Sequence, residues 1–419
     1  MDQALLYFDF LLYFKVENLT STYFINLKFM TINNIQKQLK TLEINLIRKD
    51  IGFYDRLIEL TSKKQSNGIL IFGMIPYISL FTIESYTYIQ KVLPHHLRNL
   101  SKDNEKIIRN ARMRLKLFDD SNNRVDGTFY LLDEISEFLK DLFINSHKGS
   151  FASIKKALQP DMGISFYVNH IVSSTHTGLL LSGLEKVQLS EEFEDTEDNT
   201  TKILYMVGKE LGEYLGWLKK LPEFKSIKTN AFKYEIEDSK FYYQDVKSDE
   251  FFSSSFNKSD QNSINFSLLL FLSTVNFIDH IFTRIISEDV VYSFFKIKFI
   301  MLYHLASSLK KLESYCYPKN SLSNDSKEFL KKILKDKDLK MIQSKTELRN
   351  ILVHYKIGKN SDLYFSGDFN FKTLIEYFFN GHTFEEIDGK VNHQIKRISS
   401  ILEQWSNWSL DSSQYSRYF

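Results

Sequence analysis

The sequence predicts an all-α protein, because residues that break helices are scarce and residues that favour them are abundant. The chain of 419 residues contains only five prolines and fifteen glycines. Leu, Ile, Lys, Glu and Phe fill long uninterrupted stretches between these breakers, as helices require. We therefore expect two helical-bundle domains, with at most a small β-hairpin between them.

The length predicts more than one hydrophobic core, and loop-forming segments along the chain indicate where the cores divide. Residues 1–190 form the expected N-terminal helical domain, whose role the sequence does not indicate. The acidic run SEEFEDTEDNT then opens a connector, residues 191–254. Its charges repel one another and cannot bury apolar area, which is typical of a solvated loop. The alternative is an acidic peptide that docks on a basic partner.

The connector also contains the one stretch with the period of a β-strand. In AFKYEIEDSKFYYQDV, apolar and charged residues alternate from Phe232 to Ile236, break at Asp238-Ser239 and resume at Phe241. A period of two indicates strands, so we expect a small hairpin here.

Residues 255–410 form the expected C-terminal domain, with four or five helices. Asn380-Gly381 ends one helix, and Thr383 with Glu386 forms a capping box that begins the last one.

The stretch SSTHTG, near Ser173 in the first domain, predicts a helix end with polar caps rather than a nucleophile site, because no acid partner accompanies it.

Several features favour a cytoplasmic protein. The single cysteine, Cys316, excludes an internal disulfide and a cysteine-built zinc site. The amino terminus lacks the positive start and the cleavage site of a secretory signal. The apolar stretches 264–286 and 290–305 contain charged residues, so they predict buried helices rather than membrane spans. We expect no membrane partner and no cofactor or metal.

The stretch ELRNILVHY, residues 347–355, indicates a chemical function more directly than any other part of the sequence. Ser344 and Glu347 form a capping-box signal, so we expect a helix to start at Ser344 or to be reinforced there, and to end at Gly358. The core-facing stripe is expected to contain Leu348, Ile351, Leu352 and Tyr355. The opposite face is expected to carry Arg349, Asn350, Val353 and His354. Because Val353 is apolar, this face needs a second cover, either another helix of this chain or the same helix of a second copy.

The Arg349-Asn350-x-x-x-His354 pattern resembles the Arg-x4-His motif of the HEPN superfamily, helical-bundle domains found in prokaryotic toxins, phage-defence proteins and CRISPR effector ribonucleases. Of the three Arg-Asn pairs in the chain, only this one has His at the fifth position after Arg. The resemblance covers roughly residues 255–408. It implies a metal-independent endoribonuclease that leaves a 2′,3′-cyclic phosphate, acts as a dimer, and serves in phage defence or a toxin-like response.

The three residues suit that reaction. Histidine side chains in general titrate near neutrality, so His354 can take the 2′-hydroxyl proton or protonate the leaving oxygen. Arg349 can clasp two phosphate oxygens, and Asn350 can orient the imidazole or hold a phosphate oxygen. One histidine cannot fill both proton-transfer positions in the same transition state, so we expect a homodimer, with a regulatory protein as a further candidate partner.

Two alternatives use the same residues without catalysis. Arg349 pairs with a carboxylate such as Glu347, while His354 hydrogen-bonds inside the bundle, as isolated Arg and His residues on helices commonly do. Otherwise the same face binds RNA or a partner protein without cutting it.

A second candidate RNA-binding feature is a row of cations at three- and four-residue steps. The row consists of Arg98, Lys102, Lys106, Arg109, Arg112 and Lys116. Such a stripe could follow an RNA backbone. The plainer interpretation, a solvated face partly neutralised by Asp103 and Glu105, is favoured by the net charge of only +2.

Overall fold

The structure is a computed structural model and describes most of the chain between residues 37 and 407. The described ranges are 37–61, 67–96, 98–118, 125–145, 152–184, 196–225, 232–234, 236–257, 260–286, 290–319, 321–357 and 370–407. Helices dominate this part of the chain, which confirms the all-α fold class.

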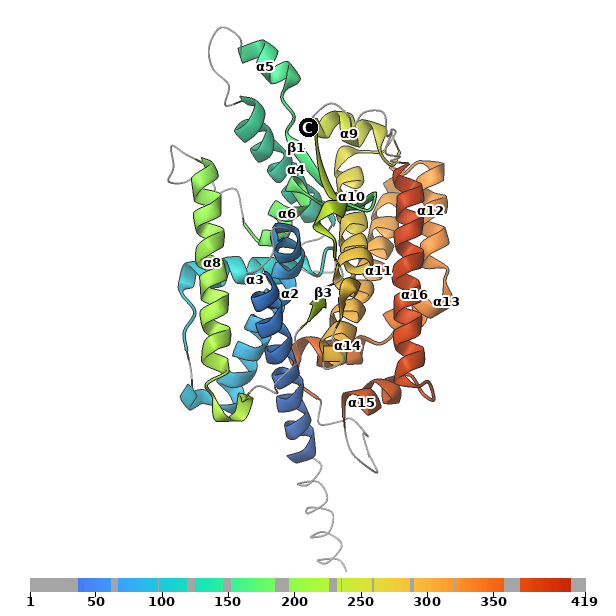
Figure 1. Ribbon diagram of the computed structural model, residues 1–419. Helices are drawn as coiled ribbons and strands as arrows, with labels where there is room; N and C mark the ends of the chain where they lie inside the picture. Colours follow the sequence, from blue (N-terminus) through green and yellow to red (C-terminus); the bar gives the residue numbers. More distant parts are fainter. Residues whose placement is uncertain are drawn as a thin grey trace, which may run out of the picture.

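The helices fall into an N-terminal and a C-terminal set (Figure 1). The first set comprises a helix over 37–61, α2 (Asn67–Val92), α3 (Lys102–Arg114), α4 (Val125–Lys140), α5 (Ala152–Leu158), α6 (Thr175–Ser182) and α8 (Thr196–Leu218). The second comprises α9 (Ser248–Ser254), α10 (Asn262–Asn276), α11 (Val291–Lys319), α12 (Asn324–Leu334), α13 (Lys337–Gln343), α14 (Thr346–His354), α15 (Phe371–Phe378) and α16 (Phe384–Ser406). Short turns include the π-helices η2 (Asp141–Asn145) and η5 (Phe277–Ile281) and the 3-10 turns η1 (Pro94–His96), η3 (Pro222–Phe224), η4 (Asp238–Lys240) and η6 (Phe282–Arg284).

The strands form two small sheets, and the expected hairpin in the connector is wrong in its pairing. The strands are β1 (Met162–Tyr167), β2 (His170–Ser174), β3 (Lys233–Tyr234), β4 (Phe241–Val246) and β5 (Ile285–Ile286). Strands β3 and β4 lie where the alternating pattern places them, but β4 pairs with β1, and β3 pairs with β5. The period of two identified strands correctly, whereas their partners depend on packing between distant segments.

A true hairpin occurs where the sequence predicted only helix. Strands β1 and β2 pair antiparallel across a turn at Val168 and Asn169, both of which have positive φ. The turn lacks the Asn-Gly or Asp-Gly signal of a tight hairpin, which explains why the pattern was missed.

The two longest apolar helices of the C-terminal set form the centre of the protein. Nearly every described residue of α10 is buried, as is most of the first two thirds of α11. A helix that is apolar on all sides must be covered on all sides. In Figure 1, the N-terminal helices α2, α3 and α8 lie on one side of this pair, and α16 with α12 and α13 lies on the other. One continuous apolar core therefore contains residues from both expected domains, and the division into domains stays a prediction.

Two helical stretches are long and apolar enough to cross a membrane, Gly68–Val92 and Asn262–Arg284. In each, about three quarters of the most apolar window is buried inside the fold, at 72% and 78%. The apolar side chains of both stretches are thus packed in the core, as predicted for the second stretch.

Two predicted caps are confirmed. Thr383 accepts a hydrogen bond from the backbone of Glu386, whose carboxylate accepts one from the backbone of Thr383, so the box begins α16. Ser174 caps α6 in a reciprocal pair with Thr177, so SSTHTG is a capped helix start. His176, within it, is fully buried between the rings of Phe252 and Phe266.

The burial of His176 predicts a stability loss in mild acid. Burial lowers its pKa to about 4, below the ordinary value of about 6.5. Since the unfolded chain then binds more protons between these values, stability falls as pH drops through about 6.5, by up to about 3 kcal/mol. Urea unfolding at several pH values should show this loss and its absence in His176→Met. A His393→Gln control, at an exposed position, should keep it; equal pH profiles in wild type and His176→Met would contradict the assignment.

Candidate functional site at helix α14

Helix α14 carries the Arg-Asn-x-x-x-His pattern, but it begins later and ends earlier than the sequence predicted. Ser344 belongs to the end of α13, and the N-cap of α14 is Lys345, which makes no side-chain cap. The predicted start at Ser344 is therefore wrong, because α13 extends up to the same residue. Tyr355 ends α14 in the left-handed conformation, with φ of 56°. The expected end, Gly358, lies outside the described residues.

The two faces of α14 are as predicted. The side chains at the four core-stripe positions are buried, namely Leu348, Ile351, Leu352 and Tyr355. Val353, on the other face, is also buried, and α14 packs against α2 of the same chain. Of the two expected covers for this face, the structure thus provides a helix of this chain.

A buried polar cluster fixes the end of α14. The phenol of Tyr355 donates to Asp50 Oδ2 at 2.6 Å, and Lys296 Nζ lies 2.6 Å from the same oxygen and 2.7 Å from the phenol oxygen. Ser293 donates to the other carboxylate oxygen. Burial lowers the pKa of Lys296, and the charge of Asp50 limits that fall. The cluster joins the 37–61 helix, α11 and α14, and so positions His354, the residue directly before Tyr355.

His354 contacts a carboxylate that the sequence analysis did not identify. Its Nδ1 lies 2.7 Å from Glu84 Oε2, and Glu84, on α2, is 5% exposed. The other Glu84 oxygen forms an ion pair with Arg112, next to the C-terminal end of α3. His354 therefore does hydrogen-bond within the fold, as one alternative expected, although 45% of its side chain remains exposed.

The electrostatics of Glu84 follow from these two partners. Burial by itself raises the pKa of its carboxyl, but the hydrogen bond to His354 and the charge of Arg112 outweigh burial, so the pKa lies below its ordinary value. Glu84 is then ionised at neutral pH and accepts a hydrogen bond from His354 Nδ1. The second ring nitrogen, Nε2, makes no hydrogen bond to any described residue. This arrangement leaves Nε2 as the ring nitrogen through which a ligand can contact His354.

The other two motif residues lie beside His354 in different surroundings. The guanidinium of Arg349 stacks over the Tyr303 ring, 5.1 Å from its centre. Asn350 is exposed and makes no hydrogen bond with another described residue, so Glu84, and not Asn350, orients the imidazole in this structure.

The motif borders a small hollow between the two sets of helices. Its lining includes Arg349, Val353 and His354 from α14, Arg112 and Lys116 from the α3 end, and His304 from α11. The hollow holds about 50 Å³, room for a few water molecules but not for a nucleotide. A larger ligand must therefore meet His354 from its exposed edge, or α2 and α3 must move.

The predicted cation row divides at this hollow. Arg112 and Lys116 reach it, whereas Arg98 pairs with Glu213 and Arg109 pairs with Glu105. Lys102 and Lys106 are exposed on α3. The plainer interpretation, a solvated and partly neutralised face, thus fits the first four members of the row, and the last two belong to the candidate site.

Glu84 and His304 are the site residues that sequence reasoning missed. Glu84 is the single carboxylate of the apolar helix α2, and His304 is the single histidine of α11. A lone carboxylate in an apolar helix signals a buried partner, but the sequence does not indicate which cation provides it.

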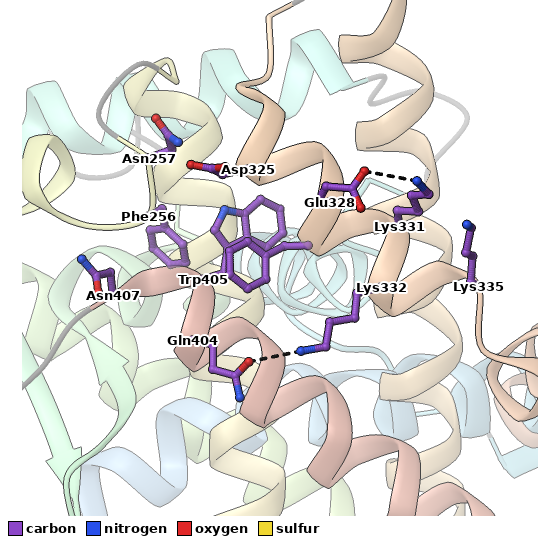
Figure 2. A pocket seen from close by; sticks show the side chains of 11 residues that line it. Phe256, Asn257, Asp325, Glu328, Lys331, Lys332, Lys335, Gln404, Trp405 and Asn407 are labelled. Atoms are coloured by element: carbon purple, nitrogen blue, oxygen red, sulfur yellow. Dashed lines mark hydrogen bonds and ion pairs between the residues drawn. The ribbon is translucent and has the colours of Figure 1, made fainter.

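A larger groove lies elsewhere, between α12 and the end of α16. Figure 2 shows Lys331 and Lys332 on its rim, paired with Glu328 and Gln404, beside the ring of Trp405. Trp405 is stacked on Phe329, with ring centres 5.6 Å apart. The lining contains no histidine or arginine, so the groove lacks the imidazole and guanidinium groups found at α14.

Comparison of the chain with protein-family models, with curated proteins and with solved structures found no match. The resemblance to HEPN domains therefore stays a prediction from the sequence.

Removal of the Tyr355 hydroxyl should destabilise the fold measurably. Tyr355→Phe keeps the ring but leaves Asp50 and Lys296 without their shared partner, and loss of a hydrogen bond to a buried charge costs about 2 kcal/mol. Urea unfolding monitored by circular dichroism measures this. Tyr205→Phe, at a position 71% exposed, is the matched control; equal midpoints for the two variants would show that the cluster does not hold α14.

Proposed function

We propose that this protein is a metal-independent endoribonuclease of HEPN type, in which His354 is a proton-transfer group and Arg349 binds the scissile phosphate. The observation that carries the proposal is the contact between His354 and Glu84: it fixes the ring through Nδ1 while an exposed edge, with no described partner at Nε2, faces the arriving ligand. A carboxylate that orients a histidine in this way is a common device for proton transfer.

The charges around His354 support an anionic substrate. Arg349, Arg112 and Lys116 border the same hollow, and one carboxylate, Glu84, faces them. Phosphate oxygens are attracted to such a surface. A divalent cation is disfavoured there, because three cationic side chains surround a single carboxylate.

In the proposed reaction, His354 takes the proton of the ribose 2′-hydroxyl. The O2′–P bond forms, the P–O5′ bond breaks, and Arg349 stabilises the charge on the phosphate oxygens. A second acid gives its proton to O5′. The products are a 2′,3′-cyclic phosphate and a 5′-hydroxyl.

The second acid is proposed to come from a second copy of the chain, as expected from the single motif. The exposed edge of His354 is where a second copy can approach, since the α2 and α3 side is covered. Activity of such a composite site requires the dimer. Specific activity should therefore fall on dilution, in parallel with dissociation measured by sedimentation velocity.

The remaining parts of the proposal concern context. We propose a cytoplasmic protein that acts in phage defence or a toxin-like response. The N-terminal helices are proposed to restrain the nuclease, because Glu84, from that part of the chain, contacts His354 directly and is itself paired with Arg112. The rival function is a non-catalytic module that binds RNA or a partner protein through the same face. The exposed side chain of Asn350 is equally suited to that role.

Cleavage of labelled RNA in EDTA tests the enzyme against the module. We expect wild-type protein to cut and His354→Ala to lose at least about a hundredfold in rate, the usual contribution of a proton-transfer group. His393→Ala, on the exposed face of α16, is the control for a contaminating nuclease and should retain full activity. Binding without cleavage in all three proteins would support the module, and cleavage that survives in His354→Ala would overturn the proposal.

A lysine pair from the cation row tests where RNA lies. Lys116 borders the hollow, while Lys102 is at the far end of α3, roughly 20 Å away along a helix that rises about 1.5 Å per residue. Lys116→Gln should weaken RNA binding and reduce the slope of log affinity against log salt by about one. Lys102→Gln should change neither; equal effects would point to diffuse binding along the whole face.

A further inference from the structure

Three side chains from distant segments converge at a second place in the fold. His170 is the first residue of β2, His280 lies in the π-helix η5, and Glu403 lies in the last turns of α16. Each offers one ligand atom, and these atoms all lie within 4.8 Å of one another. Among the described residues, no other group of three or more His, Cys, Asp or Glu side chains converges in this way.

The two imidazoles and the carboxylate are in direct contact. His170 Nδ1 lies 2.5 Å from Glu403 Oε1, and the rings of His170 and His280 are stacked with centres 3.7 Å apart. His280 Nε2 is buried and has no hydrogen-bond partner among the described residues. A buried ring nitrogen without a partner is costly unless a ligand satisfies it.

A second layer of hydrogen bonds holds the carboxylate. Asn276 is fully buried and donates from Nδ2 to Glu403 Oε1 at 3.1 Å and to the carbonyl oxygen of Ile171 at 3.0 Å. Ser399 donates to Asn276 Oδ1 at 2.6 Å. Outer hydrogen bonds of this kind orient the ligands of metal sites.

The backbone around the cluster is specialised. Helix α10 ends at Asn276 and continues as the π-helix η5, which carries His280. Single π-turns in helices frequently occur at functional sites. The side chains of His170 and Glu403 are 30% and 33% exposed, so an ion can reach the cluster from solvent.

A further carboxylate borders the cluster. Asp279 Oδ2 lies 3.8 Å from His280 Nε2, and the Asp279 side chain is 10% exposed. Lys396 and Arg284 are nearby cations.

We propose that His170, His280 and Glu403 bind a zinc ion, which fastens β2 and η5 to α16. Two imidazoles and one carboxylate suit zinc, whereas magnesium and calcium prefer oxygen ligands alone. Tetrahedral zinc with bonds of about 2.1 Å needs ligand atoms roughly 3.4 Å apart. Because the two imidazole rings are stacked, with 10° between their planes, the rings must turn toward a common point when the ion binds. Water fills the fourth position.

This zinc site departs from the sequence-based expectation of no metal, and it is independent of the proposed nuclease. It shares no residue with the hollow at α14, and its role is to hold elements together. Histidines separated by 110 positions in the chain gave no ligand spacing that a sequence pattern could reveal.

Metal retention tests the proposal with the full chain. Purified protein is dialysed against micromolar Zn²⁺ and then against buffer without metal, and bound zinc is measured by mass spectrometry. We expect one equivalent per chain and a higher melting temperature than after chelation, with no such rise from Mg²⁺. Retention of less than half an equivalent by the wild-type protein would overturn the proposal.

Two variants and a control locate the ion. Glu403→Gln keeps an oxygen that accepts the hydrogen bond from Asn276, and His280→Ala removes one imidazole; each should lower zinc affinity by at least about tenfold and abolish the zinc-dependent rise in melting temperature. His393→Ala should retain both. Equal zinc binding by all four proteins would place the ion elsewhere and refute the assignment, and Co²⁺ absorption bands from the wild type, lost in Glu403→Gln, supply an independent readout.

Discussion

The arrangement of the candidate site depends on one buried ion pair, that between Asp50 and Lys296. The two charges are 1% and 2% exposed, so neither is tolerable without the other, and Tyr355 completes the cluster. Removal of one partner from such a pair is far more destabilising than the pair is stabilising. The pair therefore acts mainly to align these elements. Both charges are satisfied only in the packing in which the 37–61 helix, α11 and the end of α14 meet. That packing in turn fixes His354 beside α2.

The contact between Glu84 and His354 follows from this alignment. Because Tyr355 is anchored, the preceding histidine must lie against the middle of α2, where Glu84 is the available acceptor. The ion pair with Arg112 then neutralises a carboxylate that burial would otherwise protonate. Helices α2, α3 and α14 thus contribute to the surroundings of one imidazole, and the N-terminal helices form part of the candidate site. Any movement of α2 or α3 would alter both the orientation and the exposure of the imidazole.

Prediction succeeded where the signal was local. Scarcity of proline and glycine predicted the helical class, the capping box at Thr383 marked the start of α16, and helical periodicity separated the buried stripe of α14 from its polar face. Prediction failed where the local sequence fits two different structures equally well. Ser344 fits the start of one helix as well as the end of another, and the alternating residues around Phe241 specify a strand but not its partner. Strand pairing and helix ends are settled by competition among segments for the same core.

The sequence by itself determined the helical class, the motif of Arg349, Asn350 and His354, and the need to cover Val353, since each depends on residues within a few helical turns. Only the tertiary structure decided which helix covers the Val353 face, which carboxylate contacts His354, and which cations border the same hollow. Those choices depend on packing between segments more than two hundred residues apart, such as α2 and α14. No short-range pattern encodes them, because the free energy that selects them comes from one core shared by the whole chain.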